Sequence, residues 1–191
     1  MTEQDYIDYF TDLATKNLAI GHTPDRPRFY VIHDNNMSEL TNAMRNLRVP
    51  ALLIDQYYDD IDRTQDNPRL RISGGLNVLV KCNTGDTKDV RRAREEARQI
   101  ARQFLNRMFN DSRTPGSVLC RQGRAVTVST QYQGEPMADM QNYAGWGYPF
   151  EWTVAQNVAV VNNEWDDLRP KPAPEPEPVP APQPAPVLSQ D

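Results

Sequence analysis

The clearest element in this sequence is one long helix, which is predicted by the run TKDVRRAREEARQIARQFLNRMF at residues 87–109. Asp86 precedes the run and can act as its N-cap, and Asp89 falls in the first turn, where a carboxylate favours the positive end of the helix dipole. Apolar side chains recur at three- and four-residue steps and form one stripe: Val90, Ala93, Ala97, Ile100, Ala101, Phe104 and Met108. The stripe predicts a helix that packs one face against a sheet.

Strand patterns flank this helix in five segments, at residues 28–33, 51–55, 70–83, 124–133 and 149–161. The segments are rich in β-branched and aromatic side chains, and turn residues bound them. The second is a continuous apolar run, which is typical of a strand buried on both faces. Gly74-Gly75 interrupts the third, where a glycine pair indicates a bulge or a sharp bend.

Two further helices complete the pattern. Residues 3–18 have one apolar face with Thr2 as N-cap, and residues 38–47 predict a shorter helix that ends before Val49-Pro50. The predicted order is therefore α-β-α-β-β-α-β-β. This order predicts an α+β fold, with a mixed, mostly antiparallel sheet of about five strands and helices packed on it.

The composition changes near residue 167. Residues 1–167 predict one α+β domain, and residues 168–191 predict a proline-rich tail. Proline alternates with other residues from Pro170 to Pro186, which favours an extended polyproline II arm and leaves no apolar core to bury. We expect an extended or disordered end.

The charge balance and the termini limit the partners. A net charge of −5 argues against bulk nucleic-acid binding, which usually needs a basic domain or stripe. No apolar run approaches the roughly 20 residues of a membrane span, and the acidic start MTEQD lacks the features of a secretory signal. We therefore expect a protein made in the cytoplasm, without membrane partners and without specific nucleic-acid binding.

Familiar catalytic and metal-binding patterns are missing from the sequence. Cys82 and Cys120 form no CxxC pair, and with His22 and His33 they match no common zinc spacing. The sequence also lacks a Gly-x-Ser-x-Gly elbow, and Gly85-Asp86-Thr87-Lys88 lacks the rest of a phosphate loop. We expect two free thiols, no catalytic site and no cofactor.

An acidic segment at residues 59–68 predicts a polar loop. It carries Asp59, Asp60, Asp62 and Asp66 after Asp55. Their spacing resembles an EF-hand only faintly, because Gln65 stands where glycine is required and Arg71 stands where glutamate is required. We interpret the loop as solvated or as a partner-facing acidic patch, with a divalent-cation site as the alternative.

The long helix presents a row of arginines, Arg91, Arg94, Arg98 and Arg102, at three- and four-residue steps. The row is either a solvated face partly paired with Glu95 and Glu96, an interface for carboxylates, or a nucleic-acid contact. The segment at residues 143–149 is rich in glycine and aromatic side chains and predicts a loop. Its Trp146 and Tyr148 either close the core or anchor an interface.

In its order of elements the chain resembles the tail-terminator, or tail-completion, proteins of tailed bacteriophages and their relatives in contractile injection systems. The resemblance is architectural and covers most of residues 1–165, ending in the run FEWTV at residues 150–154. It implies a structural virion protein rather than an enzyme. It also implies a homo-oligomeric ring, commonly of six subunits, that caps the tail tube and offers a surface to the neck or head connector.

The hypothesis that follows is a ring subunit assembled in the bacterial host cytoplasm and located in the tail or neck of the virion. Its predicted interface residues are Arg91, Arg94, Arg98, Arg102, Asp59, Asp60, Asp62, Asp66, Trp146 and Tyr148. One alternative is a monomeric adaptor whose proline-rich arm recruits a partner. Another is an enzyme whose site assembles only in the fold, with Asp55, Asp60 and His33 as candidates.

Overall fold

The computed structural model describes residues 1–32, 47–64, 68–121, 124–137, 142–156 and 165. The chain divides into two units, Met1–Asn157 and Val158–Asp191. The first unit carries all the helices and strands given below, and Trp165 is the described residue of the second. The predicted helix at residues 38–47, apart from Leu47, and the proline-rich tail lie outside the described residues.

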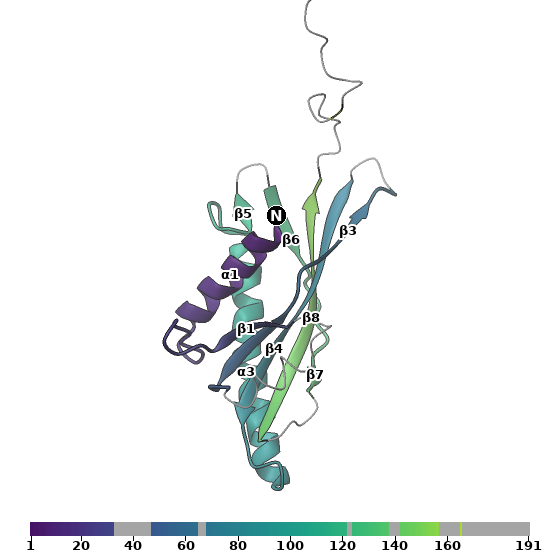
Figure 1. Cartoon of the computed structure of the whole chain (residues 1–191). Coiled ribbons are helices and arrows are strands. Elements are labelled where there is room, and N and C mark those ends of the chain that lie inside the picture. Colours follow the sequence, from purple (N-terminus) through teal and green to yellow (C-terminus); the bar gives the residue numbers. More distant parts are fainter. Residues whose placement is uncertain (33–46, 65–67, 122–123, 138–141, 157–164, 166–191) are drawn as a thin grey trace, which may run out of the picture. The chain divides into compact units, whose positions relative to one another are not determined.

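An eight-stranded sheet forms the centre of the first unit, with strands in the order β1-β2-β4-β8-β6-β5, while β3 pairs with β4 and β7 pairs with β8 (Figure 1). The strands are β1 (Phe29–Ile32), β2 (Ala51–Asp55), β3 (Tyr58–Asp62), β4 (Arg69–Lys81), β5 (Cys120–Arg121), β6 (Arg124–Val128), β7 (Glu135–Pro136) and β8 (Tyr143–Ala155). Only the β1–β2 pair among them is parallel. The predicted α+β class with a mixed, mostly antiparallel sheet is confirmed, whereas the expected number of about five strands was too low.

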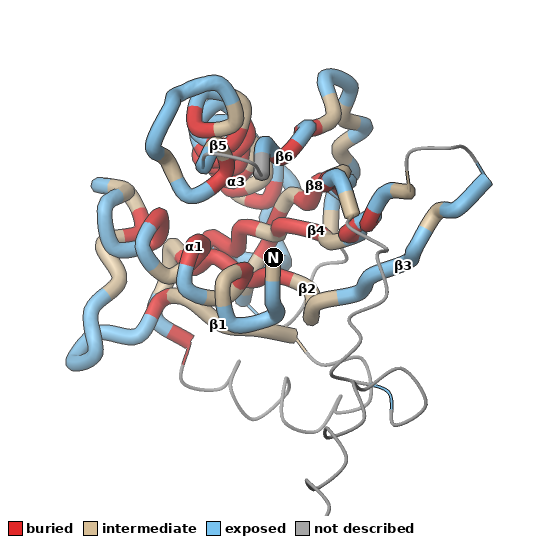
Figure 2. Tube along the Cα trace, turned by 90° about the horizontal axis from the view of Figure 1, so that it is seen from above, coloured by how far each residue is buried: buried red, intermediate tan, exposed pale blue. Residues whose placement is uncertain are grey.

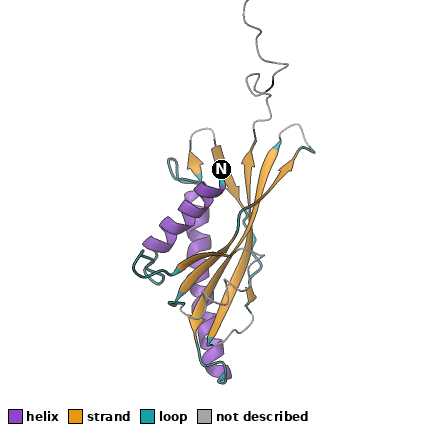
Figure 3. Ribbon diagram, in the orientation of Figure 1, coloured by secondary structure: helices purple, strands orange, loops and turns teal. Residues whose placement is uncertain are grey.

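Two helices, α1 (Glu3–Lys16) and α3 (Thr87–Asp111), lie on the same face of this sheet (Figure 3). Thr2 and Asp5 form a capping box at the start of α1, and the Asp86 carboxylate accepts a hydrogen bond from the Lys88 N–H at the start of α3. Every residue of the predicted apolar stripe of α3 is buried. Helix α1 ends at Lys16, two residues before the predicted end.

The main core lies between these helices and the sheet, and it is rich in aromatic side chains. The rings of Phe10 in α1 and Trp152 in β8 stack with their centroids 5.6 Å apart, and the Tyr6 ring meets the edge of Trp152 at 5.7 Å. Figure 2 shows that buried residues concentrate where α1 and α3 cover the sheet. Burial of these large rings is the main stabilising contribution of this layer.

Strand β2 is buried on both faces, as its continuous apolar run predicted. Leu52 and Ile54 belong to the main core, whereas Ala51 and Leu53 pack with Leu79 on the opposite face of the sheet. All four β2 residues, from 51 to 54, are at most 1% exposed. The sheet therefore has a second, smaller core on the face that α1 and α3 do not cover.

The acidic segment predicted as a loop contains a strand, β3, and this prediction was wrong. Residues 58–62 pair antiparallel with residues 69–73 of β4. The backbone of an edge strand can pair while charged side chains project into solvent, so the acidic composition was a poor guide. Figure 2 shows β3 as an exposed strand at the edge of the sheet.

The bulge or bend predicted at Gly74-Gly75 does not lie in β4 itself but in the segment that pairs with it, at the end of β2. Strand β4 pairs with β8 in unbroken register through both glycines. On its other edge, residues 55–57, from the last residue of β2 to the start of β3, stand opposite only residues 74 and 75, which is the pattern of a β-bulge. The bulge places the Asp55 carboxylate against Gly75, where a Cβ would collide with it.

The prediction of a glycine- and aromatic-rich loop at residues 143–149 is also wrong, because these residues form the first half of β8. Gly145 and Gly147 are needed there because a Cβ at either position would strike the neighbouring β4, at the Val78 carbonyl and the Asn77 side chain respectively. These close contacts with β4 therefore explain why a strand contains residues that usually indicate a turn.

Candidate interface

The N-terminal part of α3 and the first half of β8 bring together four of the predicted interface residues. The Arg98 guanidinium carbon lies 5.6 Å from the centroid of the Trp146 ring, within the range of a cation–π interaction. Arg102 Nε donates a hydrogen bond of 3.4 Å to the Tyr148 hydroxyl oxygen. We call Arg98, Arg102, Trp146 and Tyr148 the arginine–aromatic cluster.

The rings of this cluster close the core. Tyr148 is buried and Trp146 is partly buried. Gly134, just before β7, lies so close to both rings that a Cβ there would collide with Tyr148 Cε1 and Trp146 Nε1. The arginines are therefore the part of the cluster that reaches the surface, where the rings below restrict their conformations.

The other arginines of α3 differ in their surroundings. Arg92 pairs with Asp89 and Glu96 at 2.8 Å each, and Arg98 also pairs with Glu95. Arg91 is exposed and Arg94 is half-buried. Exposed ion pairs of this kind contribute little to stability, and so they leave the row available to a partner with better-placed carboxylates.

The acidic residues of β3 do not form a single patch. Asp60 lies directly across the ladder from Arg71, and Asp62 lies across from Arg69. Asp59 projects to the other face, beside Tyr57. Burial, and then the carboxylates of Asp59 and of residues 3 and 5, raises the pKa of Tyr57 to about 12. Asp66 lies outside the described residues, and the described carboxylates of the predicted acidic patch are divided between two faces of β3.

The residues named for an enzyme or a metal site are spread over different elements. The Asp55 carboxylate accepts a hydrogen bond of 3.4 Å from the Asn77 side chain, and Asp60 lies further along, in β3. His33 lies outside the described residues. Within the described part of the chain, no group of three or more His, Cys, Asp or Glu side chains is placed to hold a metal ion. Cys82 is buried and Cys120 is half-buried, and neither forms a disulfide within the described residues.

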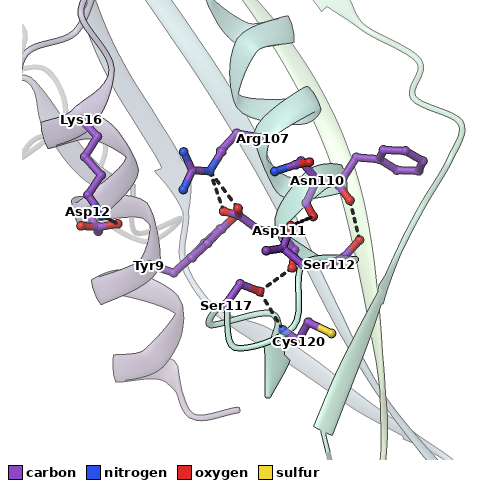
Figure 4. A network of polar contacts seen from close by, with 11 residues as sticks. Tyr9, Asp12, Lys16, Arg107, Asn110, Asp111, Ser112, Ser117 and Cys120 are labelled. Atoms are coloured by element: carbon purple, nitrogen blue, oxygen red, sulfur yellow. Dashed lines mark hydrogen bonds and ion pairs between the residues drawn. The ribbon is translucent and has the colours of Figure 1, made fainter. Parts of the chain in front are cut away.

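A polar network at the C-terminal end of α3 was not predicted from the sequence (Figure 4). Asp111 is 6% exposed. Its carboxylate accepts hydrogen bonds from the Tyr9 hydroxyl at 3.1 Å and from Arg107 Nε at 2.8 and 2.9 Å, while its carbonyl accepts one from the Ser117 hydroxyl. The four-residue spacing of Arg107 and Asp111 was the one signal in the sequence. We call these four residues the Asp111 network, which ties α1 to α3.

The two helices carry opposite net charges. Helix α1 has four carboxylates and one lysine, a net charge of −3, whereas α3 has seven basic and four acidic side chains, a net charge of +3. In α3 the excess lies entirely in residues 87–102, since residues 103–111 contain one arginine and one aspartate. The helix face of the domain is therefore electrostatically polarised.

Comparison with known proteins leaves the family open. No protein-family model matches the chain, and no curated protein matches it in sequence. Among the described residues, neither helix is long and apolar enough to cross a membrane. The fold and the surfaces define an α+β domain in which one sheet face is covered by an acidic and a basic helix.

Proposed function

We propose that this chain is a structural virion protein that assembles through its folded domain into a homo-oligomeric ring at the end of a phage tail or in the neck. In that place the ring caps the tail tube and joins it to the head connector. The location in a phage tail or neck and the expected six subunits come from the architectural resemblance to tail-terminator proteins. It needs a surface on the folded domain that is suited to a protein partner.

The observation that carries the proposal is the arginine–aromatic cluster. Arginine, the residue type by which this cluster reaches the surface, is among those that contribute most to protein–protein binding energy. Arg98 and Arg102 are already restrained by Trp146 and Tyr148, so less side-chain entropy is lost when a partner binds. A guanidinium group held in this way is suited to bind carboxylates.

A ring also requires that each subunit use two different surfaces, one for each neighbour. Such heterologous contacts close into a ring when the rotation between subunits allows it. The polarised helix face supports this requirement, because one domain carries both a basic and an acidic surface.

Light scattering on the purified full-length protein tests the proposal. The mass is measured over a tenfold range of concentration, at two salt concentrations, with and without the cognate tail-tube protein. We expect a discrete oligomer near six subunits, or a monomer that becomes one when the tube protein is added. A strict monomer under all these conditions would overturn the ring.

Deletion of residues 168–191 separates the ring from the adaptor alternative. If the folded domain builds the ring, the shortened chain should assemble to the same mass as the full chain. A shortened chain that loses its partner while remaining a well-folded monomer would favour the adaptor, because only the proline-rich arm has been removed.

A further inference from the structure

Helix α1 presents a row of carboxylates on its exposed side. Asp8 and Asp12 are exposed and four residues apart, so they lie on the same face, and Glu3 is exposed near the start of the helix. Asp12 pairs with Lys16 at 2.7 Å, but both side chains are at least half exposed, at 50% and 60%. A pair so exposed is weak and leaves the row acidic.

The basic part of α3 extends beyond α1. Helix α1 has 14 residues and α3 has 25, which correspond to lengths of about 21 and 38 Å at 1.5 Å per residue. Contacts between them involve the C-terminal part of α3, through the hydrogen bonds Asn17–Gln103 and Tyr9–Asp111. Helix α1 therefore lies beside residues 103–111, and Figure 1 shows the N-terminal part of α3 running past α1.

The acidic strand β3 is a poorer match for these arginines than α1. Arg69 lies opposite Asp62 and Arg71 lies opposite Asp60 in the ladder, although Arg71 also pairs with Glu151 of β8 at 3.5 Å. In α1 the described carboxylates outnumber the cations by four to one. The paired strands β3 and β4 have three carboxylates and three cations, whereas α1 has a net charge of −3, with Arg107 near Asp12 and Arg121 near Asp5 as neighbouring cations.

We infer that α1 of one copy of this chain docks on the N-terminal part of α3 of the next copy, with Asp8 and Asp12 facing Arg91, Arg94 and Arg98. The inference rests on the proposed ring and names its contact. Each copy contributes its acidic helix to one neighbour and its basic helix to the other, which is a heterologous interface. Both rows advance by three or four residues per step, so carboxylates and guanidinium groups follow similar spacings along the two helices.

Charge reversal with mixing tests the inference. Arg91→Glu alters the basic row without touching the arginine–aromatic cluster, and Asp8→Arg alters the acidic row. Each variant alone places like charges at the contact, and we expect at least a tenfold rise in the concentration needed for assembly. An equimolar mixture of the two should assemble as the unmodified chain does. When copies alternate around the ring, the new Glu of one variant meets the new Arg of the other at one contact. At the next contact the natural arginine and aspartate meet. The double variant should also assemble.

The matched control is Asp60→Arg, which makes the same charge change on the acidic strand β3 and should leave assembly unchanged. Circular dichroism and thermal melting establish that every variant is folded. If Asp60→Arg blocks assembly and Asp8→Arg does not, the acidic surface is β3 and the inference is wrong. If both single variants assemble normally, or the mixture fails to recover, it is also wrong.

These results are distinguishable from failure of the ring itself. An unmodified chain that stays monomeric, with and without tube protein, overturns the proposed function and this contact together. An unmodified chain that forms the ring while Arg91→Glu and Asp8→Arg have no effect overturns only the contact. A contact made as inferred should also weaken with salt, since exposed charge pairs are screened over about 8–10 Å at physiological ionic strength.

Discussion

The two ends of α3 use charge in opposite ways. At the C-terminal end, Asp111 is buried and its carboxylate is bound by Tyr9 of α1 and by Arg107. Toward the N-terminal end, residues 87–102 carry a net charge of +3, and Arg98 and Arg102, near the middle of the helix, rest on aromatic rings of β8 and reach the surface. One end of this helix therefore stabilises the domain, while the other carries unneutralised positive charge at the surface.

The physical reason lies in burial. A carboxylate taken out of water must be paired and hydrogen-bonded, because leaving it alone costs several kcal/mol. An exposed arginine keeps its hydration and needs no partner within the domain. Substitutions at the Asp111 end should therefore change the free energy of unfolding. Substitutions of exposed arginines toward the other end should instead change assembly.

The largest effect is expected for Asp111→Ala. The change leaves the Tyr9 hydroxyl without its acceptor and removes the cross-link between α1 and α3. Removing one partner of a buried pair usually costs about 3–5 kcal/mol. Because Arg107 is half exposed and can be rehydrated, we expect a loss at the lower end of this range, about 3 kcal/mol in the free energy of unfolding. Urea denaturation followed by circular dichroism measures it, and a loss below about 1 kcal/mol would contradict the assignment of this end as the stabilising one.

The next effect is expected for Gly134→Ala, which tests how tightly the rings of the arginine–aromatic cluster are covered. The added methyl group would collide with Tyr148 and Trp146, and we expect a loss of about 2 kcal/mol from overpacking. Gly85→Ala is the control, because a Cβ there meets only the Asn83 side-chain oxygen, at 3.3 Å. Equal melting temperatures of the two variants would show that the rings have room to move.

A smaller effect is expected for Tyr9→Phe, which deletes one hydrogen bond of the Asp111 network and keeps the aromatic ring in the core. Asp111 retains Arg107 as a partner, so we expect a loss of about 1 kcal/mol in urea denaturation. The double variant Tyr9→Phe/Asp111→Ala should be less destabilised than the sum of the two single variants. Additive losses would mean that the two side chains do not act together.

Much of the fold follows from patterns that a sequence displays directly. The stripe of α3 repeats at helical spacing, and residues 51–54 form an apolar run, so their burial was predictable. Strand β3 was missed because its charges resemble those of a loop, although only its backbone pairs with β4. The first half of β8 was missed because its glycines serve to let β4 approach, and the sequence alone does not reveal that neighbour.

The candidate interface was predictable only in part, for the same reason. The arginine row is visible as helical spacing, and Trp146 and Tyr148 are visible as aromatic residues. That Arg98 lies over Trp146 depends on the register of β8 with β4, which pairs Trp146 with Val78 and directs its ring toward α3. The partner role of Asp111 likewise depends on where α1 packs.

The smallest effect is expected for Arg98→Met, which keeps a long apolar side chain over Trp146 and removes the charge. Loss of an exposed cation–π contact and of the pair with Glu95 should cost about 0.5–1 kcal/mol in urea denaturation. Arg91→Met is the matched control, since Arg91 is exposed on the same helix, and its stability should stay within about 0.5 kcal/mol of the unmodified chain. If the two variants lose the same stability, Trp146 does not hold Arg98, and the arginine would have to be ordered by the partner when the interface forms.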